Sequence, residues 1–148
     1  RGETMFKHVH HVHYVVRNRA AIMDYFEKNF GMKPAHVVDY PDGKQKDVIY
    51  EIGETHIQIT EPVDPNCTSG KFLAQHGPGV LHVAWAIDNI RQAAKDLAAK
   101  GNKIRGNKEG LTESPRGYLT INIDQASSHE LWLQLAEGDH EIKSKQGA

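Results

Sequence analysis

The chain has 148 residues, of which 39% are hydrophobic, and a formal net charge of −1 with neutral histidines. This size and composition indicate one globular domain, and the near-zero charge argues against nucleic acid or an anionic membrane surface as a partner. No apolar run approaches the roughly 20 residues that span a bilayer. The single cysteine, Cys67, excludes an internal disulfide and favours a reducing, cytoplasmic location.

The first half of the chain predicts a strand, a helix and three further strands. Residues 6–16 are rich in β-branched and aromatic side chains, which is typical of a strand. Asn18 is suited to cap a helix over residues 19–29, and Gly31 is suited to end it. Three strands separated by turn sequences follow, over residues 35–40, 47–52 and 55–61.

The second half repeats this order after a connector. Residues 62–70 are rich in Pro, Asp, Asn and Ser, and a short helix is predicted over residues 71–76. A strand over residues 80–87 and a helix over residues 90–100 begin the second copy. A polar loop over residues 106–117 is of the kind that often lines binding sites. The remaining strands are predicted over residues 103–105, 118–123 and 130–136.

Two sequence motifs occur once in each half. Residues 11–18 (HVHYVVRN) match residues 82–89 (HVAWAIDN), and residues 57–62 (IQITEP) match residues 133–138 (LQLAEG). A repeat on this scale indicates two copies of one structural unit. We therefore predict two β-α-β-β-β modules joined by a linker, with the modules over residues 6–62 and 80–137 and the linker over residues 63–79.

Each copy carries a His in its first strand and a Gln in its last. His11 and Gln58 are 47 residues apart, and His82 and Gln134 are 52 residues apart. Gln58, His82 and Gln134 lie between aliphatic neighbours, and His11 lies between His10 and Val12. In a strand, each of these side chains faces either solvent or a cavity. Duplication of both positions favours one shared cavity. Since neutral imidazole and amide oxygen both ligate divalent metals, the four residues predict a charge-neutral metal site.

Other polar residues in these strands are weaker candidates. His13 and His56 share strand faces with the two ligand candidates of the first module, so packing, solvent contact and entry into the cavity all stay open for them. Glu61 and Glu137 also repeat, but their odd offset from the glutamines predicts solvated carboxylates on the opposite face.

The strand order and these motifs resemble the vicinal oxygen chelate superfamily, which includes glyoxalase I, extradiol dioxygenases, bleomycin- and fosfomycin-resistance proteins and methylmalonyl-CoA epimerase. The resemblance covers residues 6–136. Its most specific stretch is residues 71–84 (KFLAQHGPGVLHVA), which are similar to the linker and second His strand of the epimerases. Residues 57–62 are similar to the fourth strand of that group.

The resemblance implies an α+β fold in which the two modules form a curved, partly open barrel around a central cleft, and it implies a homodimer. It also implies a divalent metal ion (Co, Mn, Ni or Zn) with the ligands His11, Gln58, His82 and Gln134. The last position departs from the family pattern, because the epimerases have Glu there. Asp42 lies in a turn where the epimerases carry a carboxylate implicated in proton transfer, which makes it the candidate catalytic base.

The implied function is metal-dependent proton abstraction next to a carbonyl, by an epimerase, isomerase or lyase that acts on a small molecule such as an acyl-CoA. One alternative is a non-catalytic binding protein of the bleomycin-resistance type, which needs no metal. Another is a glyoxalase- or dioxygenase-like enzyme with a different substrate, although the two-His, one-carboxylate chemistry of dioxygenases lacks its carboxylate here. The basic residues that could hold substrate phosphates, or simply be solvated, are Lys44, Lys46, Arg105, Lys108 and Arg116.

Overall fold

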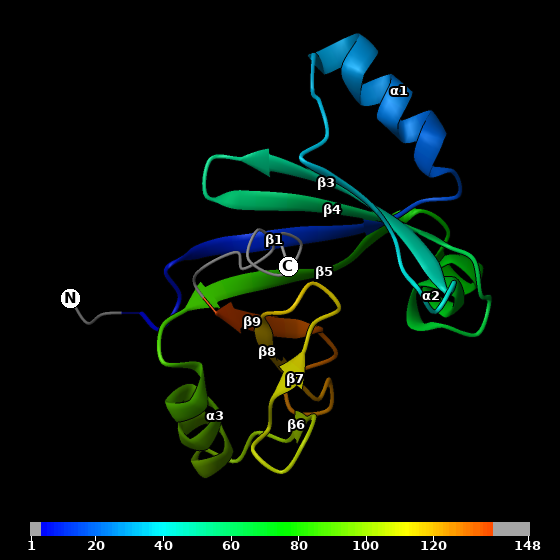
Figure 1. Cartoon of the computed structure of the whole chain (residues 1–148). Coiled ribbons are helices and arrows are strands. Elements are labelled where there is room, and N and C mark those ends of the chain that lie inside the picture. Colours follow the sequence, from blue (N-terminus) through cyan, green and yellow to red (C-terminus); the bar gives the residue numbers. More distant parts are fainter. Residues whose placement is uncertain (1–3, 138–148) are drawn as a thin grey trace. The chain divides into compact units, whose positions relative to one another are not determined.

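The computed structural model describes residues 4–137, and the chain divides into two compact units. The central unit comprises residues 11–82, and the terminal unit combines the residues up to 10 with those from 83 onward. Both units contain strands and helices (Figure 1), which confirms the predicted α+β class. Among the described helices, none has the length and apolar character needed to cross a membrane.

The central unit is built on strands in the order β2-β3-β4-β1. Strand β3 pairs antiparallel with both β2 and β4, whereas β1 pairs parallel with β4. The β-α-β-β-β order predicted for this half of the chain is confirmed. The elements are β1 (His8–Val15), α1 (Arg19–Phe30), β2 (His36–Asp39), β3 (Gln45–Ile52), β4 (Thr55–Pro62) and α2 (Thr68–His76).

Helix α1 packs on one face of the central sheet (Figure 1). It begins where the Asn18 side chain accepts a hydrogen bond from the Ala21 amide at 2.9 Å, and it ends at Gly31, whose φ of 67° few other residues adopt. The apolar residues that pack between helix and sheet are Ile22, Met23, Phe26, Val48, Tyr50, Ile57 and Ile59. Because side chains alternate along a strand, the intervening residues of β3 and β4 lie on the opposite face.

The terminal unit has the strand order β5-β9-β8-β6, with β7 paired to β8. Its β5 and β9 are parallel, as β1 and β4 are in the central unit. Helix α3 packs its apolar side on β8 and β9 through Ile90, Ala93 and Ala94. The elements are β5 (Gly79–Ile87), α3 (Ile90–Ala99), β6 (Ile104–Arg105), β7 (Thr112–Glu113), β8 (Leu119–Ile123) and β9 (Leu133–Glu137).

The two copies of the repeat share their strand register. On β1, His13 lies opposite Gln58 of β4, and on β5, Ala84 lies opposite Gln134 of β9. The duplicated histidines lie two residues before these positions, at His11 and His82. The likeness seen in the sequence therefore extends to the backbone pairing.

Helix α2 begins at Thr68, three residues before the predicted start. Gly70 explains the difference, because a Cβ at this residue would lie 2.5 Å from the carbonyl oxygen of Asp64. The absence of a side chain lets the first turn of α2 pack directly against the Pro-rich connector.

Two further differences lie in the terminal unit. The predicted loop over residues 106–117 contains the short strand β7, since Gly106, with a φ of 133°, brings the chain close to its own later residues. Strand β9 begins three residues later than predicted because His129 and Glu130 adopt positive φ in a turn. Such conformations depend on local packing rather than on β propensity.

Candidate functional site

The face of the central sheet opposite α1 carries buried polar side chains. We call this set the polar face, and its members, each at most 8% exposed, are His11, His13, Asp47, His56, Gln58 and Thr60. His82 on β5 and Gln134 on β9 are equally buried. The side chains of all four predicted ligands are thus withdrawn from solvent. Burying a polar group costs free energy unless the group forms hydrogen bonds or binds a ligand, so the partners of these side chains are decisive.

The two duplicated histidines meet through their ring nitrogens. The Nε2 atoms of His11 and His82 are 3.3 Å apart, and the ring planes are inclined at 70°. The His13 ring lies beside them, with its centroid 4.9 Å from that of His82. Three imidazoles therefore occupy one region of the central unit, and the Nε2 atoms of two of them lie within hydrogen-bond distance of each other.

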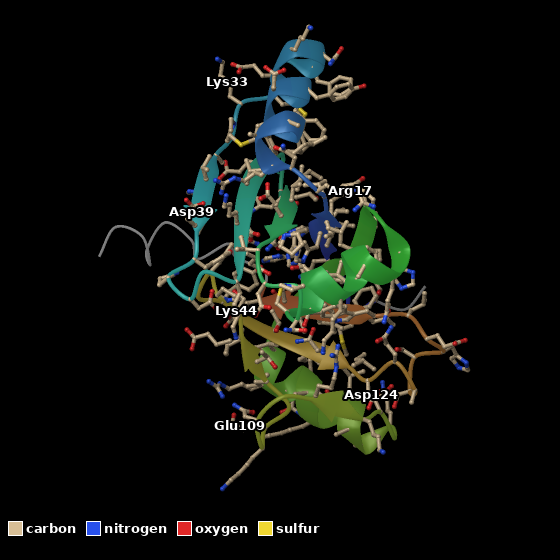
Figure 2. The ribbon with its side chains drawn as sticks, turned by 90° about the vertical axis from the view of Figure 1, so that its right-hand side faces the viewer. Arg17, Lys33, Asp39, Lys44, Glu109 and Asp124 are labelled. Carbon is tan, nitrogen blue, oxygen red and sulfur yellow. The ribbon has the colours of Figure 1, made fainter. Side chains whose placement is uncertain are left out.

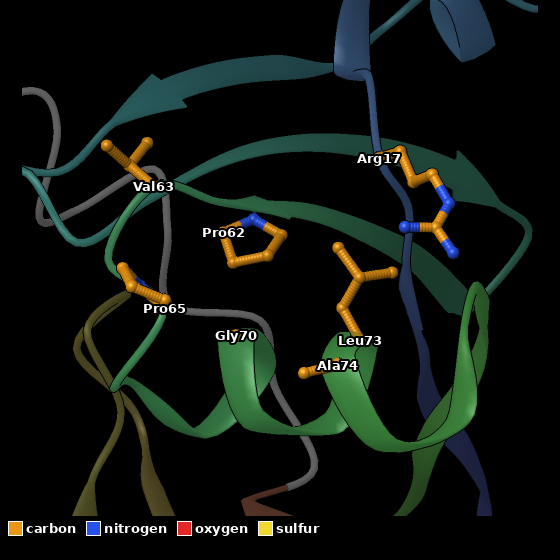
Figure 3. Close-up of a pocket in the computed structure, with 7 residues that line it drawn as sticks. All are labelled: Arg17, Pro62, Val63, Pro65, Gly70, Leu73 and Ala74. Carbon is orange, nitrogen blue, oxygen red and sulfur yellow. The ribbon is translucent and has the colours of Figure 1, made fainter.

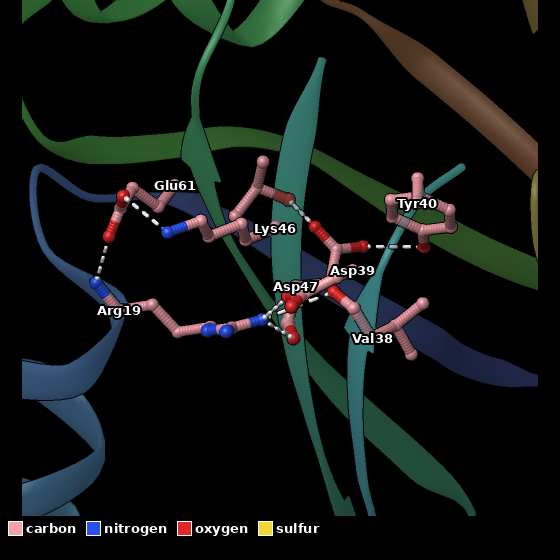
Figure 4. A network of polar contacts seen from close by, with 8 residues as sticks. Arg19, Val38, Asp39, Tyr40, Lys46, Asp47 and Glu61 are labelled. Atoms are coloured by element: carbon pink, nitrogen blue, oxygen red, sulfur yellow. Dashed lines mark hydrogen bonds and ion pairs between the residues drawn. The ribbon is translucent and has the colours of Figure 1, made fainter. Parts of the chain in front are cut away.

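Asp47 organises the hydrogen bonds of the polar face. Its carboxylate is fully buried and accepts from the Tyr40 hydroxyl at 2.8 Å, as Figure 4 shows, and from the Thr60 hydroxyl at 2.6 Å. Thr60 Oγ1 also lies 2.7 Å from His13 Nε2. Since the single hydroxyl hydrogen of Thr60 is donated to Asp47, His13 must donate from Nε2, which fixes its protonated ring nitrogen.

Both predicted glutamine ligands have their amide nitrogens bound to the neighbouring strand. Gln58 donates from Nε2 to Asp47 Oδ2 at 2.7 Å, within the central unit. Gln134 donates from Nε2 to Asn122 Oδ1 at 2.9 Å, within the terminal unit. Asp47 and Asn122 therefore bind the nitrogen end of each glutamine amide. The other end is the carbonyl oxygen, which is the atom that can ligate a metal.

The residues of the central unit fit a divalent metal ion. Two imidazole nitrogens on one ion at about 2.0–2.1 Å in a tetrahedral shell lie about 3.3 Å apart, which is the separation of His11 and His82. The same distance also suits a hydrogen bond between neutral rings. Residues 4–137 hold no group of three or more His, Cys, Asp or Glu side chains placed to bind a metal. A metal bound by His11 and His82 could take glutamine oxygen as a further ligand.

The structure brings together only part of the predicted ligand set. His11 and His82 are in contact, and Gln58 lies on the polar face beside His13. Gln134 belongs to the terminal unit. Its participation in the same shell stays a prediction.

Asp42, the predicted base, lies in the turn between β2 and β3. Its carboxylate is exposed and accepts a hydrogen bond from the Lys44 amide at 3.0 Å. This contact is the usual one for Asp in a turn. A catalytic role for Asp42 stays a prediction.

The sequence predicted that the duplicated glutamates are solvated. Each of them instead accepts a hydrogen bond from a backbone amide. Glu61 Oε1 accepts from the Arg19 amide at 2.7 Å, at the start of α1 (Figure 4), where a negative charge is favoured by the helix dipole. Glu137 Oε2 accepts from the Leu119 amide at 2.6 Å. Both glutamates are half-buried and satisfy backbone amides.

The candidate phosphate-binding residues have different surroundings. Arg105 stacks over the Trp132 ring, Lys46 lies 3.8 Å from Glu61, and Arg116 is buried. Charged side chains such as Lys33 and Glu109 project from the surface (Figure 2).

A pocket of about 220 Å³ lies between the end of β4 and α2. Figure 3 shows Arg17 at one end, with Pro62 and Leu73 in its wall. None of the four predicted ligands lines this pocket.

The family model for the glyoxalase/bleomycin resistance protein/dioxygenase superfamily matches residues 10–114. The chain belongs to this superfamily. The matched residues span most of the first module and include the second His strand, β5. No curated protein matches the chain.

Several solved structures are similar to the chain in fold. Methylmalonyl-CoA epimerase from Mycobacterium tuberculosis is 16% identical with a TM-score of 0.83, covering 97% of this chain and 96% of its own. Another methylmalonyl-CoA epimerase is 22% identical with a TM-score of 0.81, covering 92% and 98%. The Streptomyces coelicolor epimerase, in complex with 2-nitronate-propionyl-CoA, is 18% identical with a TM-score of 0.79, covering 89% and 97%. At these identities the likeness shows the fold.

Sequence reasoning missed Asp47 and Asn122 as hydrogen-bond partners of Gln58 and Gln134. The sequence offered one signal for Asp47, which is a charged residue near the start of a mainly apolar strand. It lies on the same face as Ile49, and it lies opposite Thr60 once β3 pairs with β4. Asn122 offered the same kind of signal inside the β8 sequence. Neither could be assigned to a glutamine without the strand register.

Proposed function

We propose that this protein is a divalent-metal-dependent epimerase or isomerase, or a related lyase, that removes a proton next to a carbonyl of a small molecule such as an acyl-CoA. The observation that carries the proposal is the 3.3 Å approach of His11 Nε2 and His82 Nε2. Support also comes from superfamily membership and from similar structures named as methylmalonyl-CoA epimerases, one of them in complex with methylmalonyl-CoA.

In this proposal, some residues of the chain bind the metal ion and another transfers the proton. His11 and His82 would hold the metal ion through Nε2, and Gln58 and Gln134 would add carbonyl oxygens. Bound there, a divalent cation supplies a Lewis acid that polarises a carbonyl oxygen. Asp42 would accept the proton. A carboxylate with an ordinary pKa near 4 is a weak base toward carbon, so it needs a substrate whose C–H group has been made more acidic.

Two further properties belong to this proposal. A homodimer would cover the exposed edge of the sheet at β2, where Val37 is 52% exposed. A reducing, cytoplasmic location agrees with Cys67, which forms no disulfide.

The test is the metal content of tag-free protein by mass spectrometry, before and after incubation with cobalt, manganese, nickel and zinc. We expect about one ion per chain, lost in His11→Ala and kept in His76→Ala, a control at an exposed histidine on α2. The loaded protein should exchange the α-proton of methylmalonyl-CoA for deuterium. Protein that binds none of these metals would overturn the proposal.

A second candidate function is a non-catalytic small-molecule binding protein of the same superfamily. The observation that favours it is the amide of Gln134 at a position where a carboxylate ligand was expected from the resemblance, which leaves a neutral ligand set. Failure to bind any metal, combined with binding of a small ligand to the His11→Ala variant, would select this function.

A further inference from the structure

We infer that Asp47 and Asn122 are positioning residues that fix Gln58 and Gln134 as carbonyl-oxygen donors. Each binds the amide nitrogen of one glutamine from the adjacent strand, at 2.7 Å for Gln58 and 2.9 Å for Gln134. The use of those oxygens by a metal rests on the proposed function. The orientation of the two amides does not.

The orientation of Gln58 follows from the chemistry of its partner. A carboxylate offers only acceptors, so the end of Gln58 that lies against Asp47 must be the amide nitrogen. Asp47 is fully buried and is held in turn by donors from Tyr40 and Thr60. A rotation of the Gln58 amide by 180° would place its oxygen against the carboxylate. The two acceptors would then repel each other in a buried place.

The orientation of Gln134 follows from a different donor. The Trp132 indole can only donate, and its Nε1 lies 2.9 Å from Asn122 Oδ1. This contact fixes which end of the Asn122 amide is oxygen, and the Asn122 nitrogen donates to Thr120 Oγ1 at 3.2 Å. Gln134 meets the same oxygen and must therefore present its nitrogen. Two unrelated sets of partners thus give both glutamines the same orientation.

This arrangement accounts for the Gln at position 134. A glutamate there would place carboxylate oxygens against Asn122 Oδ1, an acceptor already fixed by Trp132. The terminal unit is therefore built to hold an amide. Negative charge lies instead at Asp47, one hydrogen bond behind Gln58. Because hydrogen bonds in a chain polarise one another, a carboxylate behind the amide makes its carbonyl oxygen a stronger donor to a cation.

The two positions should consequently respond differently to substitution. Asp47→Asn removes the charge and lets the amide of Gln58 turn, and loss of such a partner behind a ligand typically lowers metal affinity 10–100-fold. Asn122→Asp keeps an acceptor for both Trp132 and Gln134 and adds a charge. It should leave cobalt affinity unchanged or raise it. Calorimetric titration of the metal-free wild-type protein and variants with cobalt(II) measures the cobalt affinity of each.

Nuclear magnetic resonance of the metal-free protein tests the orientation by itself. We expect slow hydrogen exchange of the side-chain amides of Gln58 and Gln134. In Asp47→Asn the exchange of Gln58 should become fast while that of Gln134 stays slow, and in Asn122→Leu the reverse should hold. Circular dichroism confirms that each variant is folded. If a variant does not fold, the exchange rates of the Gln58 and Gln134 side-chain amides in the wild-type protein test the orientation instead.

The outcomes separate this inference from the proposed function. Slow exchange at both glutamines with no binding of any metal would support the orientation and overturn the metal-dependent function. Exchange at the solvent rate in the wild-type protein would overturn the orientation, whether or not metal binds. Equal cobalt affinity of wild-type protein and Asp47→Asn would overturn the role of Asp47 in metal binding.

Discussion

The Nε2 atoms of His11 and His82 lie 3.3 Å apart, although 71 residues separate the two histidines in the chain. They occupy equivalent positions in a repeated motif, HVHYVVRN and HVAWAIDN. Because equivalent atoms of the two copies converge, a ligand that binds one histidine can bind the other.

Cobalt or zinc should stabilise the protein against unfolding. An ion that binds only the folded state adds about 2.7 kcal/mol at a free concentration 100 times its Kd. Thermal unfolding with and without metal measures the shift in Tm. The shift should disappear in His82→Ala and persist in His76→Ala. An equal shift in both variants would place the ion elsewhere.

Gln58→Glu should lower stability more than Gln134→Glu. The first substitution places a carboxylate against the buried carboxylate of Asp47, whereas the second places one against the neutral amide oxygen of Asn122. Loss of a buried hydrogen bond with an acceptor left unsatisfied costs about 1–3 kcal/mol, and more when charge is involved. Urea denaturation at pH 7 measures both. A larger loss for Gln134→Glu would contradict the charge argument.

Asp42→Asn should lower turnover of an acyl-CoA substrate while leaving metal content unchanged. The residue is exposed in a turn, and an Asn side chain can accept the same hydrogen bond from the Lys44 amide. Structure and metal binding should therefore be preserved. Deuterium exchange at the substrate α-carbon measures turnover, with general-base loss costing about 10²–10⁴-fold. Unchanged exchange would remove Asp42 from the mechanism.

Tyr50→Phe should leave stability at pH 7 unchanged or raise it by up to about 1 kcal/mol. The Tyr50 hydroxyl is buried and has no hydrogen-bond partner among residues 4–137, and its ring packs against Phe26. Burial, and then the negative charge of Glu27, raise the pKa of Tyr50 above its ordinary value near 10.

The raised pKa gives this substitution a pH dependence. Above about pH 10 the unfolded chain ionises at Tyr50 before the folded protein does, so the free energy of unfolding falls as the pH rises. Tyr50→Phe removes this contribution. Urea denaturation at pH 7 and pH 11 should show a smaller alkaline loss for the variant, and an equal loss would contradict the assignment.

Arg116→Met should be better tolerated than Arg116→Ala. The guanidinium is buried, donates to the Tyr118 hydroxyl at 2.6 Å, and has an Nη1 without an acceptor in the described part of the chain. Methionine keeps the apolar stem in contact and removes the buried charge. We expect a change within about 1 kcal/mol for Met and a loss of about 2 kcal/mol for Ala. Chemical denaturation of both variants measures the difference.

The amino-acid sequence by itself determined the repeat, the helices and strands, and the four duplicated polar positions. Periodicity, the Asn18 cap and the Gly31 stop act over a few residues, so they can be read locally, and α1 forms where they predict. The side chains of His11, Gln58, His82 and Gln134 are all buried, so none of them faces solvent.

Only the tertiary structure decided the partners of those residues. Asp47 reaches Gln58, and Asn122 reaches Gln134, because β3 pairs with β4 and β8 pairs with β9 in one particular register. A shift of one residue would turn these side chains to the other face. The strand register is set by packing between residues far apart in the sequence. The orientation of each glutamine amide depends on that register, so it is a property of the folded chain.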